Sequence, residues 1–340
     1  MKAAIFKAPG QPLAIESVPD PVPGPGEMVI KVGRCGVCGT DLHRTEAHEG
    51  FTLPTGSMLG HEFAGEVVAL GSGVEGFRTG DRITAMPFAG CGQCESCRNG
   101  LPLFCRSDFR PMIGGFAEYA RVGFRESVKL PDALSLADGA LVEPLAVGLR
   151  AVRLAGIGPG ARVLVIGAGP IGLATIYWAA QAGAAWVIVQ AASTRRRQLV
   201  EALGGTELVA AGETTREELL QRLGGEADVV FEAAGMPGLI EKAVDFVRPC
   251  GKVVVMGLCM SADTFMPAVA LRKGLQMIFS TAYDIAAFRG VVDALDAGQV
   301  EARAMVTDTV SMADFPQAFE ALRRPAGQVK LMLDPWKVLS

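Results

Sequence analysis

The sequence has no excess of positive charge, because its formal net charge is −4. A chain without a basic field has no general attraction for nucleic acid or for an acidic membrane surface, which argues against both as partners. The sequence also has no long apolar run near its amino end, where residues 1–10 read MKAAIFKAPG. No signal peptide is visible there, so we expect a reducing, cytoplasmic location.

Charged residues are missing from Val163 to Thr194, a stretch long enough to suggest a membrane span. This stretch is interrupted by helix breakers, namely Gly167, Gly169, Pro170, Gly172 and Gly183. The breakers favour a strand, a turn, a helix and a second strand over one membrane helix. We therefore interpret the stretch as a buried β-α-β unit.

Length and pattern predict two domains, since 340 residues exceed what one hydrophobic core usually organises. The first 150 residues contain short apolar runs separated by Pro/Gly clusters, which is typical of a partly open β-barrel. From Ala161, apolar strands alternate with helical segments, the pattern of a doubly wound parallel sheet. We expect a barrel domain over residues 1–148, a nucleotide-binding domain over 149–285, and a return to the barrel domain over 286–340.

The second domain can be divided further by its apolar pattern. We expect strands over 163–166, 186–189, 229–231 and 252–256, and helices over 170–182, 194–203 and 239–246. A strand over 329–333 is expected in the tail. The predicted fold is therefore an α/β protein with a β-barrel.

Four of the eight cysteines lie close together, at Cys91, Cys94, Cys97 and Cys105. Glycines around them leave the backbone free to wrap four thiolates around one ion. Such a site has no place for water, so we predict a structural zinc in a lobe at about residues 88–110. The alternative is a redox or disulfide cluster, which a reducing compartment disfavours.

A second group supplies fewer ligands. The chain has only three histidines, and one of them, His61, follows Cys38 by 23 residues. Cys38 and His61 are good zinc ligands, and either Glu62 or Glu143 can add an oxygen. A lone histidine is more often a core residue, but Cys38 and the other motifs favour a ligand. An open metal position is what Lewis-acid chemistry needs, so we predict a catalytic zinc.

Two further side chains near Cys38 can move a proton. Thr40 and His43 follow it by two and five positions, on a turn that leads into a helix. An alcohol held by zinc loses its proton more easily, and a hydroxyl followed by an imidazole offers that proton a route out. The alternatives are a helix N-cap for Thr40 and a surface position for His43. Asp41 can orient His61 from behind the metal.

A glycine motif, G-x-G-x-x-G, directly follows the apolar strand 163–166 and opens a helix. Its glycines permit a tight turn and let a pyrophosphate approach the helix N-terminus. We therefore predict that a dinucleotide contacts Gly167, Gly169, Pro170, Ile171 and Gly172.

The next strand lacks the acidic residue that usually bonds the adenosine ribose, since Ala191 stands near its end. Without that carboxylate nothing repels a 2′-phosphate, which Ser193 with Arg195 or Arg196 can bind. The alternative is that the arginines form a solvated helix face. The missing acid favours NADP over NAD.

Taken together, these motifs resemble the zinc-containing medium-chain dehydrogenase/reductase family of alcohol and polyol dehydrogenases. The resemblance covers nearly the whole chain, over Gly33–His43, Gly60–Gly65, the four cysteines, Glu143–Ala146, the glycine motif, Asp228–Gly235 and Gly327–Leu333. It implies a GroES-like catalytic domain, an inserted Rossmann domain, an active site in the cleft between them, and a homodimer or homotetramer.

The resemblance also implies roles for single residues. Catalytic zinc would bind Cys38, His61 and a third ligand, which is a cysteine in alcohol dehydrogenases proper. This chain has Glu143 there, as in the sorbitol, threonine and glucose dehydrogenase branch, where Glu62 can also bind. Lys330 would lie near the pyrophosphate. The nicotinamide would pack near Ala234, Gly257 and Leu258.

The expected reaction is reversible oxidation of a secondary alcohol or polyol to a ketone, with hydride passing to the nicotinamide. Thr40 would accept the proton and pass it through the cofactor ribose towards His43. The alternatives are a zinc-free quinone or enoyl reductase of the same superfamily and a non-catalytic nucleotide-binding protein. Neither explains the metal-binding residues. The pocket wall is less defined, because its apolar candidates are also typical of a core: Phe51, Leu53, Met58 and Met86.

Overall fold

The computed structural model describes residues 1–47, 52–324 and 327–338. The chain forms two compact units, one of Met1–Glu143 with the segment from Tyr283 onward, the other of Pro144–Ala282. None of the helices in the described ranges is long and apolar enough to cross a membrane. The uncharged stretch after Val163 forms a strand, a helix and a strand, as its breakers predicted.

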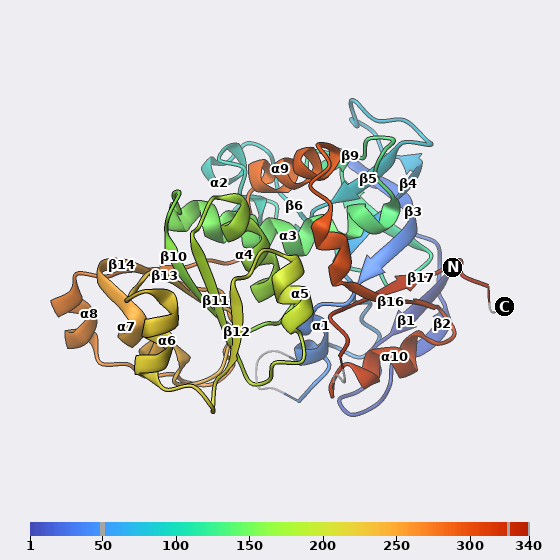
Figure 1. Cartoon of the computed structure of the whole chain (residues 1–340). Helices are drawn as coiled ribbons and strands as arrows, with labels where there is room; N and C mark the ends of the chain where they lie inside the picture. The colour runs from blue at the N-terminus through green and yellow to red at the C-terminus, as the bar shows by residue number, and fades with distance from the viewer. Residues whose placement is uncertain (48–51, 325–326, 339–340) are drawn as a thin grey trace. The chain divides into compact units, whose positions relative to one another are not determined.

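The first unit is built on a seven-stranded sheet (Figure 1). Its central strand β3 (Glu27–Gly36) pairs antiparallel with both β4 (Glu62–Leu70) and β8 (Tyr119–Gly123), so nearly every residue of β3 is buried. The other strands are β5 (Arg82–Ala85), β9 (Ser127–Lys129), β16 (Val306–Ser311) and β17 (Lys330–Asp334). A separate hairpin joins β1 (Lys2–Ile5) to β2 (Ala14–Ser17).

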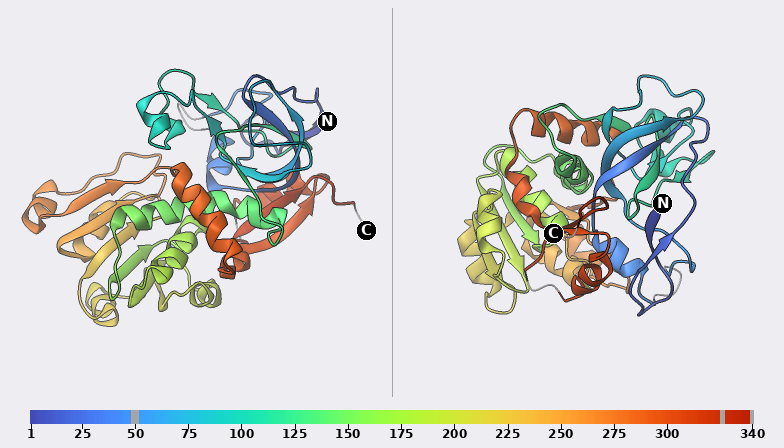
Figure 2. Two further views of the ribbon diagram at one scale, coloured as in Figure 1. Left: turned by 90° about the horizontal axis from the view of Figure 1, so that it is seen from above. Right: turned by 90° about the vertical axis from the view of Figure 1, so that its right-hand side faces the viewer.

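The end of the chain enters the same sheet as its beginning. Strand β17 pairs antiparallel with β3, with Leu333 opposite Cys35, and the red and blue strands lie side by side in Figures 1 and 2. Helix α10 (Phe315–Ala321) adds aromatic rings to the core, where Phe116 and Phe315 lie 4.7 Å apart between ring centroids. The described part of this unit also contains α1 (Gly39–Arg44), α2 (Glu95–Arg98), α9 (Ile285–Asp296) and the start of a longer helix at Leu136.

The second unit is a six-stranded parallel sheet in the order β12-β11-β10-β13-β14-β15. Counted along the chain this is 3-2-1-4-5-6, the order of a doubly wound nucleotide-binding sheet, which confirms the predicted fold class. The strands are β10 (Arg162–Ile166), β11 (Trp186–Ala191), β12 (Glu207–Ala210), β13 (Ala227–Glu232), β14 (Val247–Val255) and β15 (Gln276–Phe279). The order reverses between β10 and β13, where such sheets bind ligands at the carboxyl ends.

The helices of this unit match the predictions unevenly. Helix α7 (Leu239–Phe246) has the predicted bounds, and α4 (Pro170–Gln181) ends one residue early. Helix α5 (Arg197–Ala202) begins three residues later than predicted. Strand β12 and helix α6 (Arg216–Leu223) were not predicted, and α8 (Pro267–Lys273) lies beyond the predicted elements. Short, polar elements such as α6 give little apolar pattern to read.

A twenty-residue helix, α3 (Leu136–Ala155), was missed altogether. It contains Pro144 and two glycines, which normally end a helix. Gly148 has a packing reason, because a Cβ there would lie 2.8 Å from the backbone of Ala174 on α4. The glycine that argues against a helix therefore lets two helices approach closely.

Candidate functional site

The four-cysteine lobe is formed by β6 (Phe88–Ala89), α2, the 3-10 turn Pro102–Phe104 and β7 (Arg110–Pro111). Its sulfur atoms lie 3.9 Å apart between Cys91 and Cys97, 3.5 Å between Cys94 and Cys97, and 3.9 Å between Cys94 and Cys105. Four sulfurs around a zinc at about 2.3 Å would lie about 3.8 Å apart. The cluster therefore fits a tetrahedral ion.

Backbone groups prepare this lobe for a cation. The N–H groups of Cys91 and Asp108 donate to the sulfur of Cys105 at 3.3 and 3.4 Å. These bonds lower the pKa of the Cys105 thiol to about 6. Burial raises the pKa of the Cys97 thiol to about 12, so Cys105 is the more readily ionised of these two ligands, and the thiolate is the form that binds metal.

The open site forms where β3 and β4 pair. Gly36 lies opposite Glu62 in this antiparallel pair, so the chain leaves β3 and enters β4 at the same end. Cys38 follows the one strand, and His61 precedes the other. The ligand atoms of Cys38, His61 and Glu62 lie within 4.8 Å of one another. Two motifs distant in sequence thus meet at one point.

Asp41 ties the parts of this site together. Its carboxylate accepts the backbone N–H of Cys38 at 3.0 Å and lies 3.2 Å from Nδ1 of His61. It also accepts the N–H of Gly60 at 3.4 Å, and the side chain is buried. Burial opposes a charged imidazole, but Asp41 and Cys38 outweigh it and raise the pKa of His61. Asp41 makes the contact to His61 that its position suggested.

Glu62 is held by a partner that the sequence did not reveal. Both carboxylate oxygens accept from the ammonium of Lys330, at 2.6 and 2.7 Å, and that ammonium also donates to the carbonyl of Val37 at 3.0 Å. Neither Glu62 nor Lys330 has any exposed surface. The sequence analysis assigned Lys330 to the cofactor pyrophosphate. In the structure the Lys330 ammonium is buried and bonded to Glu62, and its assignment to the pyrophosphate stays a prediction.

Glu143 lies in α3, near the charges of His61, Glu62 and Lys330. It is not among the three residues whose ligand atoms lie within 4.8 Å of one another. Burial raises its pKa to about 7, an effect that His61 reduces and Glu62 reinforces. The buried hydroxyl of Tyr283 interacts with this carboxyl and opposes the rise in its pKa. A buried carboxyl with no bonded cation among the described residues is a group that a metal ion would complete.

Thr40 and His43 lie on α1, three residues apart and thus on one face of the helix. The N-cap of α1 is Cys38, so Thr40 lies within the first turn and the N-cap alternative is wrong. The His43 side chain is 44% exposed, and its Nδ1 lies 3.5 Å from Glu46. The face carrying Thr40 therefore continues to a residue in contact with solvent.

The glycine motif forms the turn between β10 and α4. Gly167 has φ +110°, which other residues rarely adopt, and a Cβ on Gly172 would lie 2.0 Å from the Gly167 carbonyl oxygen. Gly169 is the N-cap of α4 and Pro170 its first residue, with Ile171 half-buried behind them. The open N-terminus of this helix is a site for an anion such as a pyrophosphate.

Glu232 at the end of β13 was missed from the sequence. It is 2% exposed, and its carboxylate accepts the N–H groups of Ala234 and Gly235, both at 2.8 Å. A Cβ on Gly257 would lie 2.1 Å from the nitrogen of Gly235, so the loops after β13 and β14 touch. Ala234, Gly257 and the 44%-exposed Leu258 thus form one edge beside the glycine turn. An acid ending a buried strand was the available signal.

The end of β11 carries an unsatisfied group. The Oε1 of Gln190 is buried without a hydrogen-bond partner in the described parts of the chain, while its backbone carbonyl accepts the N–H of Gly167. A ribose hydroxyl can donate to such an oxygen. Ala191 and Ser193 follow, both half-buried.

Of the three arginines, Arg196 approaches the glycine turn most clearly. Its Nη1 donates to the carbonyl of Ala168 at 2.6 Å, and burial with the nearby Arg195 lowers its pKa. Arg195 and Arg197 are exposed. The view of all three as a solvated helix face is therefore wrong for Arg196.

The residues expected to form an apolar pocket wall do not share one environment. Met86 is fully buried and Leu53 packs against the barrel core, whereas Met58 is 36% exposed. Phe51 lies outside the described residues. The structure therefore places Met86 and Leu53 with the core.

Comparison with known proteins identifies relatives of both units. Residues 24–132 match the alcohol dehydrogenase GroES-like domain, and residues 170–297 match the zinc-binding dehydrogenase family. Sorbitol dehydrogenase of Bacillus subtilis (strain 168) is 30% identical over 98% of this chain and 97% of its own length.

Solved structures agree with this result. A zinc-binding dehydrogenase of Sinorhizobium meliloti 1021 bound to NADP has a TM-score of 0.87 and 32% identity, over 98% of this chain and 99% of that one. A short chain alcohol dehydrogenase of Escherichia coli CFT073 complexed with NADH has a TM-score of 0.89 and 27% identity, with the same coverage. These matches confirm the resemblance that the motifs suggested.

Proposed function

The chain belongs to the zinc-type medium-chain alcohol and polyol dehydrogenases, and on that premise we propose that it transfers hydride between a secondary alcohol or polyol and NADP. The observation that carries the proposal is the open group of Cys38, His61 and Glu62, with ligand atoms within 4.8 Å of one another. Three ligands leave a position for substrate. Four would close the site.

We assign two zinc ions to each chain. Cys91, Cys94, Cys97 and Cys105 would hold the structural ion, and Cys38, His61 and Glu62 the catalytic one. Glu143 is the alternative third ligand, because Lys330 already neutralises Glu62 while no cation among the described residues bonds to Glu143. When bound, the catalytic zinc supplies Lewis-acid polarisation of the substrate oxygen.

The residues around that ion orient groups and move a proton. Asp41 fixes the ring of His61 through Nδ1, which leaves Nε2 for the metal. Thr40 would accept the alcohol proton and His43 would release it to solvent, because His43 is 44% exposed and shares a helix face with Thr40. Ala234, Gly257 and Leu258 would support the nicotinamide.

NADP is proposed over NAD because of the arginine beside the glycine turn. Arg196 reaches the carbonyl of Ala168, and no carboxylate stands at Ala191 to repel a 2′-phosphate. The S. meliloti relative binds NADP, whereas the E. coli relative binds NADH. Ser193 and Arg195 complete the proposed phosphate site.

We propose a homo-oligomer that forms through the edge of the second unit. Strand β15 is the last strand of its sheet and has β14 as its neighbour. Apolar side chains around it are exposed: Phe279 by 68%, Leu271 by 82% and Met266 by 59%. An unpaired edge with apolar neighbours favours pairing with a second copy. Phe279→Lys should dissociate the oligomer in light scattering, whereas Val22→Lys, at an exposed position of the first unit, should not.

We also propose the cytoplasm as its location. All eight cysteines are free thiols, and four of them must stay reduced to bind the structural ion. A reducing compartment preserves that state. The metal content of protein purified with and without reductant tests this dependence, and equal zinc after prolonged oxidation would contradict it.

One experiment tests the proposed reaction. Zinc-loaded protein is assayed with short diols, sugar alcohols and cyclic ketones, each with NADP and NAD in parallel. We expect turnover with secondary alcohols, faster with NADP, and loss of that preference in Arg196→Ala. A protein that binds the nucleotide but turns over none of these substrates would instead be non-catalytic, and turnover without zinc would indicate a quinone or enoyl reductase.

A further inference from the structure

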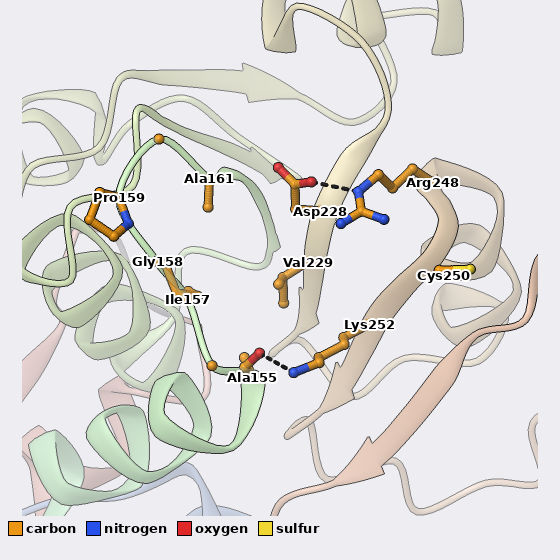
Figure 3. A pocket seen from close by; sticks show the side chains of 12 residues that line it. Ala155, Ile157, Gly158, Pro159, Ala161, Asp228, Val229, Arg248, Cys250 and Lys252 are labelled. Carbon is orange, nitrogen blue, oxygen red and sulfur yellow. Dashed lines mark hydrogen bonds and ion pairs between the residues drawn. The ribbon is translucent and has the colours of Figure 1, made fainter.

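A cavity of about 450 Å³ lies at the amino ends of the parallel strands in the second unit (Figure 3). The turn Gly156–Ala161, which leads into β10, forms one wall. The opposite wall is formed by the starts of β13 and β14, through Asp228, Arg248, Cys250 and Lys252. The glycine motif follows β10, at the carboxyl ends of the strands. The cavity therefore lies at the opposite ends of the strands from the nucleotide turn.

The backbone of β14 is deformed where it lines this cavity. Ala227 pairs with Val247 and Val229 pairs with Lys252, so the four residues between Val247 and Lys252 lie opposite the single residue Asp228. Cys250 has φ +58°, a left-handed conformation that residues with a side chain rarely adopt. Bulges and strained residues of this kind gather at functional sites.

The carboxylate in the cavity is already neutralised. Asp228 accepts from Nε of Arg248 at 2.5 Å and from the backbone N–H of Arg162 at 2.8 Å. Partial burial acts against ionisation, but these two hydrogen bonds outweigh it and lower the pKa of Asp228. Asp228 is therefore charged at neutral pH, and its carboxylate is already bonded to Arg248 and to the backbone of Arg162.

Within the described ranges, the ammonium of Lys252 has no carboxylate partner and lies instead at the C-terminus of α3. It donates to the carbonyl of Ala155 at 2.7 Å, and no carboxylate lies within ion-pair distance of it in the described parts of the chain. The Nη2 of Arg248 likewise has no acceptor among those residues. Two cations and one carboxylate line the cavity, which leaves one positive charge in excess. Both cationic side chains leave β14 on the cavity side (Figure 3).

We propose that this cavity binds a phosphate group, free or as a phosphomonoester, between Lys252 and Arg248. Its volume lies within the range of roughly 300–1,000 Å³ that is usual for small-molecule pockets, but its walls are polar where such pockets are mostly apolar. Lysine and arginine donors suit a phosphate, which carries about −1.5 to −2 charges at neutral pH. The inference does not depend on the proposed reaction.

Cys250 provides a local probe, because it is exposed and lines the cavity. Zinc-loaded, full-length protein saturated with NADP is treated with a maleimide, and the alkylation of each cysteine is followed by peptide mass spectrometry. Inorganic phosphate is titrated in, with potassium chloride added to equal ionic strength. A bound anion adds negative charge beside this segment and disfavours the Cys250 thiolate, so alkylation of Cys250 should slow about threefold or more, with saturation.

Other thiols and variants locate the effect. Cys259 follows the proposed nicotinamide edge, so its alkylation should be unchanged by phosphate. Lys252→Gln should abolish the protection of Cys250, Lys252→Arg should keep it, and Lys242→Gln, at a lysine outside the cavity, should not affect it. If Lys252→Gln does not fold, the saturation of the phosphate effect on Cys250 and the comparison with Cys259 in the wild type still test whether phosphate binds in the cavity. A sugar phosphate that protects at lower concentration than phosphate would identify a phosphomonoester as the ligand.

Three results would overturn the proposal. Phosphate and the sugar phosphate could both leave Cys250 alkylation unchanged. The chloride control could slow it equally, which would indicate general screening. Phosphate could slow Cys259 instead of Cys250, which would place the anion in the nucleotide site.

Discussion

The two cysteine-containing metal sites of the first unit are built in opposite ways. The closed site takes its four ligands from one loop, Cys91–Cys105, with backbone N–H groups around the sulfurs. The open site takes Cys38, His61 and Glu62 from separate parts of a sheet. Behind them lie the buried charges of Asp41 and Lys330. A local site needs only its own loop, whereas the open site needs a folded barrel.

This difference indicates a division of labour. The closed site can stabilise its lobe but offers no position for a substrate. The open site leaves a ligand position free and surrounds it with carboxylates and cations that position its ligands. We therefore expect damage to the closed site to reduce stability, and damage to the open site to reduce turnover.

The largest expected effects come from one serine substitution in each site. Cys38→Ser should lower kcat by about a thousandfold or more, because Lewis-acid catalysis contributes several kcal/mol, with little change in unfolding temperature. Cys94→Ser should instead reduce the free energy of unfolding by about 3 kcal/mol or more, since metal binding contributes to folding. Steady-state kinetics and thermal unfolding of both variants measure this. A Cys94→Ser protein of normal stability but no activity would contradict the assignment of stability to the closed site and of turnover to the open site.

Lys330→Met tests whether buried charge supports the open site. It leaves Glu62 buried without its cation, which should cost about 3–5 kcal/mol in the free energy of unfolding. Adding Glu62→Gln should recover part of that loss, because the uncompensated charge is then removed. Denaturant unfolding of the two variants provides the comparison. A normal stability with a raised KM for NADP would support the assignment of Lys330 to the pyrophosphate.

Asp41→Asn affects only the orientation of His61 and the nearby backbone. Loss of such a contact typically lowers metal affinity or activity by about 10–100-fold. One zinc per chain should become easier to remove with a chelator, while the other remains bound. Asp132→Asn, at an exposed acid outside the network, is the matched control. Equal zinc retention in both variants would mean that Asp41 does not support the metal.

The smallest effect is expected at a charged pair outside both metal sites. Asp138 accepts from Ser135 at the start of α3 and from Nε of Arg303 at 2.7 Å. Burial acts against ionisation, but Arg303 and Ser135 outweigh it and lower the pKa of Asp138. This stabilisation is therefore present above the unfolded-state pKa of about 3.9 and is lost as pH falls through the lower folded-state value.

Asp138→Asn should thus reduce the free energy of unfolding by about 1–2 kcal/mol at neutral pH. The difference from the wild type should shrink as the pH is lowered below about 4. Urea unfolding at several pH values measures it, with zinc content as a check. A constant difference across pH would show that the carboxylate charge is not the cause.

Motifs that depend on local spacing could be predicted from the sequence. The four cysteines, the glycine turn and the bounds of α7 each reflect constraints within a short segment. The meeting of Cys38 with His61 was inferred from metal chemistry, and the pairing of β3 with β4 provides the reason.

What could not be predicted depends on distant partners. Lys330 and Glu62 are 268 residues apart, so nothing near either residue indicates their ion pair. Glu232 accepts hydrogen bonds from the backbone N–H groups of Ala234 and Gly235. Only the folded turn directs these N–H groups at its carboxylate, so no local sequence pattern indicates the contact. Helix α3 was missed because Gly148 is selected by contact with α4, against its own helix propensity.

The division between the two sites is tested most directly by removing zinc stepwise with a chelator while following metal content, turnover and unfolding temperature together. We predict two zinc ions per chain. Removal of the first should abolish turnover with the unfolding temperature nearly unchanged, and removal of the second should lower that temperature. Full turnover with one ion left, or unfolding on loss of the first, would contradict the account.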